Sequence, residues 1–296
     1  MSLKVIRTGV STEWVKFMNN PTTDSRIMFC GLPFSGKTTF LGALSYLAIH
    51  DEIDKDMRFI GLPAQRAFFN KLSEQWLRCE EMSRTLISSQ DVIEMKLEKG
   101  EEIYSLELPD LSGETWRELW VSHELASNLQ SYLASATGVV FFIHSNEIKV
   151  PMSIADEQAI IGSQPPENNA QIEEWDAIEH SSTQAIVVDL LRKVSLEMNT
   201  SKRLALVLSA WDTQDEDPRE FVNREMPLLS QYLKAGLDYE EFKIFGVSAQ
   251  GGCLKTEESK LCLLDVDEPS NRVKVTLDGN TYHSDLTTVL SWVVGK

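Results

Sequence analysis

A chain of 296 residues with 42% hydrophobic and 8% aromatic side chains can fill a sizeable core, which excludes a disordered protein. Its formal charge of −17, from 28 basic and 45 acidic residues, disfavours nucleic acid and anionic membranes as partners, because both repel an acidic protein. No apolar run approaches the ~18 residues of a membrane span, and the first residues lack the apolar core of a signal peptide. The cysteines are scattered, with no C-x-x-C pair, which is typical of reduced thiols. We therefore expect a soluble cytoplasmic protein.

Apolar residues alternate along the chain between the two-residue repeat of strands and the 3.6-residue repeat of helices. Strands are predicted over residues 26–30, 91–99, 103–108, 139–143, 204–208 and 242–247. Helices are predicted over residues 37–49, 64–82, 115–136, 183–198, 220–235 (interrupted at Pro227) and 285–294. This order predicts an α/β fold with a doubly wound, mostly parallel sheet.

The chain divides into a short extension and one domain. Residues 1–25 are a predicted polar extension, and residues 26–296 form the domain, with insertions at about 51–84, 145–180 and 255–282. The third insertion holds a predicted hairpin over residues 272–277 that turns at Asp278-Gly279. The second and third insertions are natural surfaces for a partner protein, with solvated loops as the default expectation.

The stretch from Gly31 to Thr38 fits the pattern G-x-x-x-x-G-K-[ST], between a predicted strand and a predicted helix. Two glycines let the backbone fold so that its N–H groups point at phosphate oxygens, beside the positive end of the helix. Lys37 would reach the β- and γ-phosphates, and the Thr38 hydroxyl would bind Mg²⁺. The loop residues predicted to hold a nucleoside triphosphate are Gly31, Pro33, Phe34, Ser35, Gly36, Lys37, Thr38 and Thr39.

A second motif follows the strand predicted at residues 103–108. Asp110 to Gly113 fits D-x-x-G, in which Asp110 would hold Mg²⁺ through a water and the Gly113 N–H would contact the γ-phosphate. Such a contact senses whether the γ-phosphate is present.

Two further motifs would read the base. The strand at 204–208 leads to Asp212, whose carboxylate can accept hydrogen bonds from guanine N1–H and the 2-amino group. Adenine offers an acceptor at N1 and would leave that carboxylate unpaired, at a cost of several kcal/mol. The strand at 242–247 is followed by Ser248-Ala249, where a backbone N–H can meet guanine O6.

These four motifs, in this order, resemble those of the Ras-like GTPases of the translation-factor class, over roughly residues 26–294. More narrowly, the chain resembles the bacterial double-GTPase-type proteins found with conflict or antiphage systems. The resemblance implies a Ras-like phosphate-loop fold with one antiparallel strand at about residues 92–97, and GTP, GDP and Mg²⁺ as ligands.

The chain departs from the family pattern at three places. Ser209-Ala210-Trp211-Asp212 stands where the family has N-K-x-D, so the lysine that covers the base is missing, and Trp211 either covers the base instead or packs nearby. Glu114 replaces the usual water-orienting glutamine, where a carboxylate can polarise the water or repel the γ-phosphate. Pro33 stiffens the loop position nearest the transferred phosphate.

The resemblance also implies a threonine that binds Mg²⁺ ahead of the second strand. Thr85 is the candidate, with Ser88 and Ser89 as rivals. Its neighbour Arg84 either acts in cis on the transition state, as an arginine does in G-protein α subunits, or is a solvated or capping residue. The candidate catalytic residues are therefore Lys37, Glu114 and Arg84.

The function that the resemblance implies is slow hydrolysis of GTP to GDP and phosphate by a nucleotide-dependent switch. A protein effector or regulator is the expected partner, and a dimer is possible. The first alternative is an adaptor or assembly module that binds nucleotide without useful hydrolysis, which the missing lysine and Glu114 favour. The second alternative is an ATP-dependent phosphate-loop enzyme, against which Asp212 and Ser248-Ala249 argue.

Overall fold

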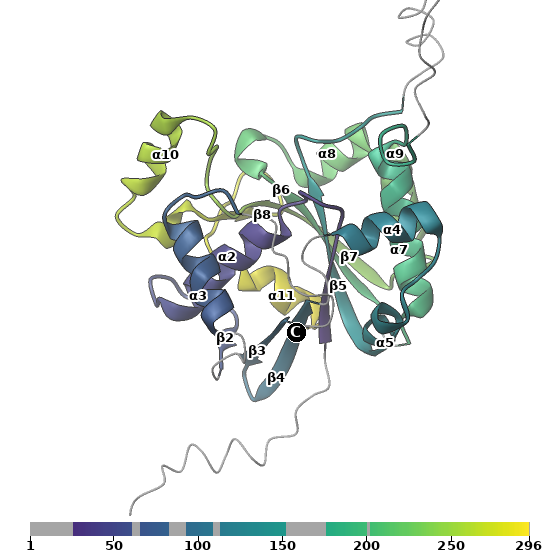
Figure 1. Ribbon diagram of the computed structural model, residues 1–296, viewed down its shortest axis with the longest axis horizontal. Helices are drawn as coiled ribbons and strands as arrows, with labels where there is room; N and C mark the ends of the chain where they lie inside the picture. Colours follow the sequence, from purple (N-terminus) through teal and green to yellow (C-terminus); the bar gives the residue numbers. More distant parts are fainter. Residues whose placement is uncertain are drawn as a thin grey trace, which may run out of the picture.

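An eight-stranded sheet in the order β2-β3-β4-β1-β5-β6-β7-β8 forms the centre of the computed structural model (Figure 1). The structure describes residues 26–60, 66–82, 93–108, 113–151, 176–199 and 202–295. The strands are β1 (Arg26–Cys30), β2 (Arg58–Phe59), β3 (Ile93–Lys99), β4 (Glu102–Leu108), β5 (Ala136–His144), β6 (Arg203–Ser209), β7 (Glu241–Ser248) and β8 (Lys274–Thr276). The mixed α/β fold and all six predicted strands are confirmed.

The sheet is mostly parallel. Parallel pairing joins β4, β1, β5, β6 and β7, so the carboxyl ends of these strands meet at one edge. The predicted antiparallel strand is confirmed as β3, which pairs with β4 and β2. The three-residue β8 is a second antiparallel strand, paired with β7, and the chain turns beyond it to form a bridge between Val275 and His283. The expected hairpin thus adds a strand that protects the edge of β7.

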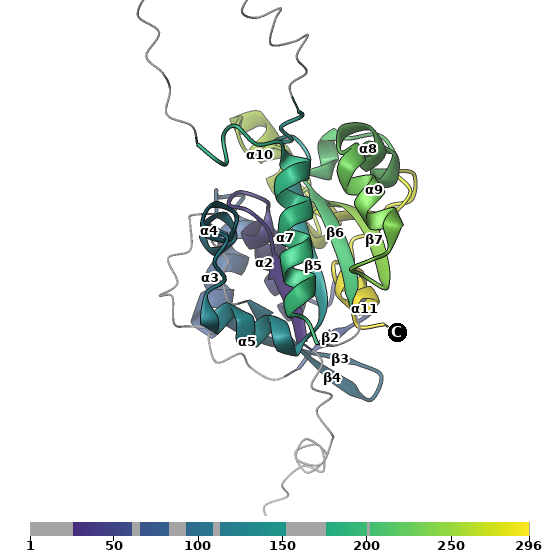
Figure 2. The same ribbon diagram turned by 90° about the vertical axis from the view of Figure 1, so that its right-hand side faces the viewer.

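Helices cover both faces of the sheet. One face carries α2 (Lys37–Ile49), α3 (Arg66–Leu77) and α11 (Thr287–Val293), and the other carries α4 (Glu114–Ser122), α5 (Ser127–Ser135), α7 (Thr183–Glu197), α8 (Pro218–Glu225) and α9 (Pro227–Ala235). Side chains of β5 alternate between the two faces, with Val140 and Phe142 in one core and Phe141 in the other. Helix α10 (Glu257–Leu264) lies apart from the sheet, and two short 3₁₀ turns occupy Trp211–Thr213 and Pro269–Arg272 (Figures 1 and 2). Within the described residues, no helix is both long and apolar enough to span a bilayer.

Two helix predictions needed correction. The single helix expected over residues 115–136 is two helices, because His123 takes a left-handed φ of 59° and ends α4. The helix expected over residues 64–82 is described only over Arg66–Leu77, followed by Cys79 with a left-handed φ of 54°. The interruption predicted at Pro227 is confirmed, since Pro227 begins α9 directly after α8.

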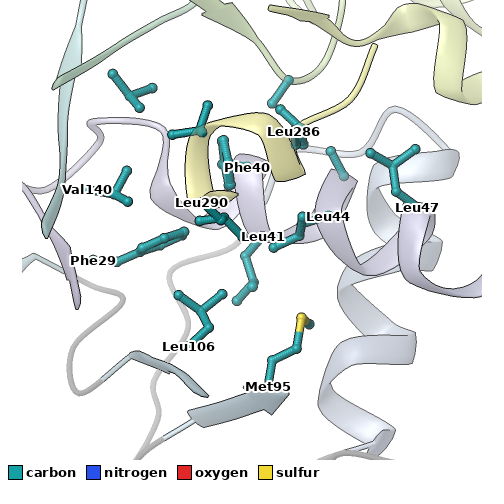
Figure 3. Close-up of a cluster of buried hydrophobic side chains, with 14 of the residues drawn as sticks. Phe29, Phe40, Leu41, Leu44, Leu47, Met95, Leu106, Val140, Leu286 and Leu290 are labelled. Atoms are coloured by element: carbon teal, nitrogen blue, oxygen red, sulfur yellow. The ribbon is translucent and has the colours of Figure 1, made fainter. Parts of the chain in front are cut away.

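Aromatic rings fix the core beneath α2. Phe29, Phe40 and Phe142 pack with ring centroids 5.0 to 5.5 Å apart, in tilted or edge-to-face geometry. Figure 3 shows Phe29 and Phe40 in one buried cluster with Leu290 of α11 and with Leu41 and Leu44 of α2. This packing anchors α2, and with it the loop that precedes the helix.

Gly246 of β7 makes a close contact that predicts a stability effect. A Cβ atom there would lie 2.4 Å from Cδ1 of Trp211, whose indole is only 1% exposed. Replacing Gly246 with alanine should therefore destabilise the fold by about 1–3 kcal/mol through overpacking. Thermal denaturation checks this, with Gly252→Ala as the control, because a Cβ at Gly252 meets Leu263 no closer than 3.4 Å. Equal melting temperatures for the two variants would contradict the prediction.

Candidate functional site

The loop after β1 is shaped by two glycines with left-handed backbone. Gly31 has φ 144°, and a Cβ there would lie 2.7 Å from the Phe142 carbonyl oxygen. Gly36 has φ 91° at the start of α2, and a Cβ there would lie 2.7 Å from the Cβ and Oγ atoms of Ser209. Both positions therefore require glycine, and the loop rests directly on the ends of β5 and β6.

Lys37 is held inside this loop. Its ammonium donates to the carbonyl oxygens of Gly31 (2.7 Å) and Leu32 (2.8 Å) and to Ser35 Oγ (3.2 Å), and the residue is 2% exposed. A cation fixed at the centre of a loop at a helix N-terminus is the arrangement that suits an anion such as a phosphate. Thr38 and Thr39 follow in the first turn of α2 and are partly buried.

Pro33 and Phe34 form the tip of the loop. Pro33 is partly buried, whereas Phe34 is 64% exposed and has a left-handed φ of 61°. This backbone conformation is strained for a phenylalanine, and such strain gathers at functional sites.

Gly113 lies against the same loop. It has φ 83°, and a Cβ there would be 2.5 Å from the nitrogen of Pro33 and 2.6 Å from the carbonyl carbon of Leu32. Glu114 then begins α4 and borders a cavity of about 760 Å³ with Phe34. The Glu114 carboxylate lies 3.9 Å from the guanidinium of Arg117. The D-x-x-G motif thus ends beside the loop, as its sequence position predicts.

The two predicted base-reading motifs are joined by a hydrogen bond. Ser248 Oγ donates to Asp212 Oδ1 (2.5 Å) and accepts from the Gly251 N–H (3.1 Å). Ser248 is 1% exposed, and the next residue, Ala249, is 9% exposed. One carboxylate oxygen of Asp212 is therefore fixed to the neighbouring strand end.

The loop carrying Asp212 is also fixed to β5. Ser145 donates its N–H to the Ser209 carbonyl (3.1 Å) and its hydroxyl to the Ala210 carbonyl (3.2 Å). Ala210 has φ 54°, which turns the chain toward Asp212. Because Ser209 also touches Gly36, the base motif and the phosphate loop are in direct contact.

The structure gives Trp211 the packing role that was one of its two alternatives. Its ring lies edge-to-face with Phe221 (centroids 5.1 Å apart) and against Gly246 of β7. The indole belongs to the core on the α7 side of the sheet. Arg84, Thr85 and Asp110 lie outside the described residues, so the second Mg²⁺ ligand and the cis arginine stay predictions.

Sequence reasoning missed a cluster of buried side chains around Ala249, in the loop that follows β7. Trp76 of α3 donates its Nε1–H to the Ala249 carbonyl (2.8 Å). Arg272 is 3% exposed, and its guanidinium lies 4.1 Å from the centre of the Trp76 ring. Burial lowers the pKa of Arg272. The helix predicted over residues 64–82 contains Trp76, but nothing in the sequence indicated that Ala249 and Arg272 would contact it.

A glycine-bounded loop with a buried lysine at a helix start, beside a carboxylate fixed on a neighbouring strand end, defines a phosphate-loop nucleotide-binding protein. The family model Double-GTPase 1 matches residues 28–293. The chain therefore belongs to the Double-GTPase 1 family, and the predicted likeness to double GTPases is confirmed.

Two solved structures are similar in part. Sup35 complexed with GDP is 15% identical, with a TM-score of 0.34, over 77% of this chain and 38% of that chain. The S. cerevisiae Ski7 GTPase-like domain bound to GTP is 13% identical, with a TM-score of 0.38, over 85% of this chain and 48% of that one. The match thus covers less than half of the Sup35 chain and less than half of the Ski7 chain. None of the curated proteins matches this chain.

Proposed function

We propose that this chain binds GTP with Mg²⁺ on a Ras-like, doubly wound fold and hydrolyses GTP slowly. The observation that carries the proposal is the contact of Gly36 with Ser209, which joins the phosphate loop to the base-reading motif. Asp212, three residues later, is held by Ser248, and the other carboxylate oxygen can accept from guanine N1–H and the 2-amino group. Triphosphate and guanine would thus be bound at one strand edge.

The phosphates would lie over the loop that holds Lys37. The Lys37 ammonium would exchange its carbonyl acceptors, Gly31 and Leu32, for β- and γ-phosphate oxygens. Thr38, in the first turn of α2, offers the hydroxyl that suits Mg²⁺, a hard cation that prefers oxygen ligands. Bound Mg²⁺ would neutralise charge on the phosphates, with Thr85 and Asp110 as the further proposed ligands.

Hydrolysis would proceed by in-line attack of water on the γ-phosphate. The loop amides and Lys37 would stabilise the charge on the transferred group, and Glu114 would lie next to the attacking water. Gly113, which already touches the loop, would lose its γ-phosphate contact after hydrolysis, which is the basis of a switch. Arg84 is proposed to assist in cis. The proposed setting is a cytoplasmic switch with a protein effector or regulator, alone or as a dimer, in a bacterial conflict or antiphage system.

A nucleotide-binding adaptor without useful hydrolysis is the second candidate. The position of Glu114 favours it, because a carboxylate at the start of α4, beside the phosphate loop, repels a γ-phosphate. The ion pair with Arg117 offsets part of that charge and favours hydrolysis.

Titration of nucleotide-stripped protein with labelled GTP, GDP and ATP in Mg²⁺, followed by phosphate release, tests these proposals. Guanine-selective binding with phosphate release supports the GTPase. Tight GTP binding without release supports the adaptor. Binding of ATP as tight as that of GTP overturns guanine recognition by Asp212 and supports an ATP-dependent enzyme.

A further inference from the structure

We propose that Trp76 is a positioning residue that sets recognition of the 6-oxo group of guanine by holding the Ala249 backbone from α3. This inference rests on the proposed binding of GTP. Ala249 directly follows Ser248, the last residue of β7, and its N–H is the group proposed to meet guanine O6.

The hydrogen bond from Trp76 is a directed contact inside the core. Trp76 is 0% exposed, its ring packs against Tyr46 of α2 at a centroid distance of 4.9 Å, and Nε1 donates to the Ala249 carbonyl at 2.8 Å. The buried indole nitrogens of Trp116 and Trp211 have no hydrogen-bond partner among the described residues. A buried indole N–H in this protein can therefore lack a hydrogen bond. The bond from Trp76 to Ala249 is thus a specific feature of this position and not a general result of burial.

Two more side chains tie the end of α3 to the same region. Gln250, next to Ala249, donates to the Trp76 carbonyl (3.3 Å) and to Cys79 Sγ (3.4 Å). Arg272 donates to the carbonyls of Trp76 (3.4 Å) and Leu77 (3.3 Å) while its guanidinium stacks on the Trp76 ring. These bonds satisfy carbonyls that a helix end leaves without an intrahelical partner.

Arg272 is in turn anchored near a carboxylate. Glu52 accepts from the Tyr46 hydroxyl (2.6 Å) and from the N–H (3.1 Å) and hydroxyl (2.7 Å) of Ser270. Ser270 lies two residues before Arg272 and is 0% exposed. Trp76 is thus clamped between α2 and the Pro269–Arg272 turn, so its N–H has a fixed position.

The loop is consequently held on both sides of the proposed O6 contact. On one side Ser248 Oγ bonds to Asp212, and on the other the Ala249 carbonyl accepts from Trp76. Fixing both neighbours fixes the direction of the N–H between them. Asp212 would read N1–H and the 2-amino group, and the Ala249 N–H would read O6 at the other end of the same base edge.

Trp76→Phe tests the proposal, because it keeps a buried aromatic ring and removes the N–H donor, while the accompanying loss of ring volume is matched by the control Trp116→Phe. The probes are GTP, 6-thioguanosine triphosphate, which replaces O6 with a weakly accepting sulfur, and inosine triphosphate, which keeps O6 and lacks the 2-amino group. We expect Trp76→Phe to weaken GTP binding about threefold to tenfold, the range for one hydrogen bond. The preference for GTP over 6-thioguanosine triphosphate should fall by a similar factor, while the preference for GTP over inosine triphosphate stays unchanged.

Trp116→Phe is the matched control, since it removes a buried indole N–H that has no partner among the described residues. It should leave both preferences unchanged. Equal weakening of all three nucleotides by Trp76→Phe would mean a merely structural role and overturns the proposal.

Arg272→Lys provides a second variant in case Trp76→Phe does not fold. It removes the planar stack on Trp76 and should reduce the same 6-oxo preference, and an unchanged preference again overturns the inference. A wild-type protein that does not distinguish GTP from 6-thioguanosine triphosphate overturns this inference alone. A wild-type protein that does not prefer GTP to ATP overturns the proposed function, and this inference with it.

Discussion

Replacing Lys37 with alanine is expected to lower GTP affinity by about 100-fold or more. The ammonium is fixed in the loop by three acceptors and is 2% exposed, so it is in place before nucleotide binds. Its bonds to two phosphate oxygens would each contribute about 1.5–3 kcal/mol, and losing both gives a factor of this size. Titration of the stripped variant with labelled GTP measures the effect.

Lys71→Ala is the matched control for Lys37→Ala. Lys71 is an exposed lysine of α3, so the substitution removes the same charge away from the loop. Circular dichroism of both variants separates lost binding from lost folding. GTP affinity that is equal in Lys37→Ala and Lys71→Ala would show that the loop does not hold the phosphates.

Replacing Asp212 with asparagine is expected to reduce GTP affinity by about 100-fold and to raise affinity for xanthosine triphosphate. Because Ser248 Oγ donates to Asp212, it selects the amide oxygen of the asparagine and leaves the NH₂ group toward the base. That NH₂ would oppose guanine donors, leaving polar groups unpaired at a cost of about 1–3 kcal/mol each. Xanthine has a carbonyl in place of the 2-amino group and would accept from the NH₂.

Competition of labelled GTP with xanthosine triphosphate measures this change in base preference. Asp215→Asn, three residues further along the same loop and exposed, should leave the preference for GTP unchanged. An Asp212→Asn protein that still prefers GTP would show that this carboxylate does not contact the base.

The sequence pattern predicted correctly those elements whose ends are determined by residues close to them in the chain. The strand Arg26–Cys30 and the helix Lys37–Ile49 agree with the structure at both ends, because an apolar run, a glycine-bounded loop and a helical repeat follow one another without ambiguity. The break at His123 was not predictable, since it depends on one residue adopting a left-handed backbone. The three-residue β8 was predicted only as part of a hairpin, because too few residues carry a strand signal.

In the candidate site, too, the features that depend on neighbouring residues were predictable and the contacts between distant residues were not. The motifs predicted which loops would meet, since carboxyl ends of parallel strands share an edge, and the contacts of Gly36, Gly113 and Ser248 agree with this. The role of Trp76 depends on a bond to Ala249, 173 residues away, and no spacing in one sequence reveals that. The sequence left two roles open for Trp211 for the same reason. Whether its ring covers the base or packs in the core depends on its contacts with Gly246 and Phe221, which are distant in sequence or on another element.

The packing of α11 has a consequence for how the protein is made. Leu286, Val289, Leu290 and Val293 are each at most 1% exposed, and they close the face of the sheet that carries Val140, Phe142, Ala205 and Val207. That apolar face stays open during translation until the ribosome has released residues 286–293, long after its strands have been synthesised. Until α11 packs, the apolar side chains of this face are exposed, and transiently exposed apolar surface of this kind makes a folding chain prone to aggregate.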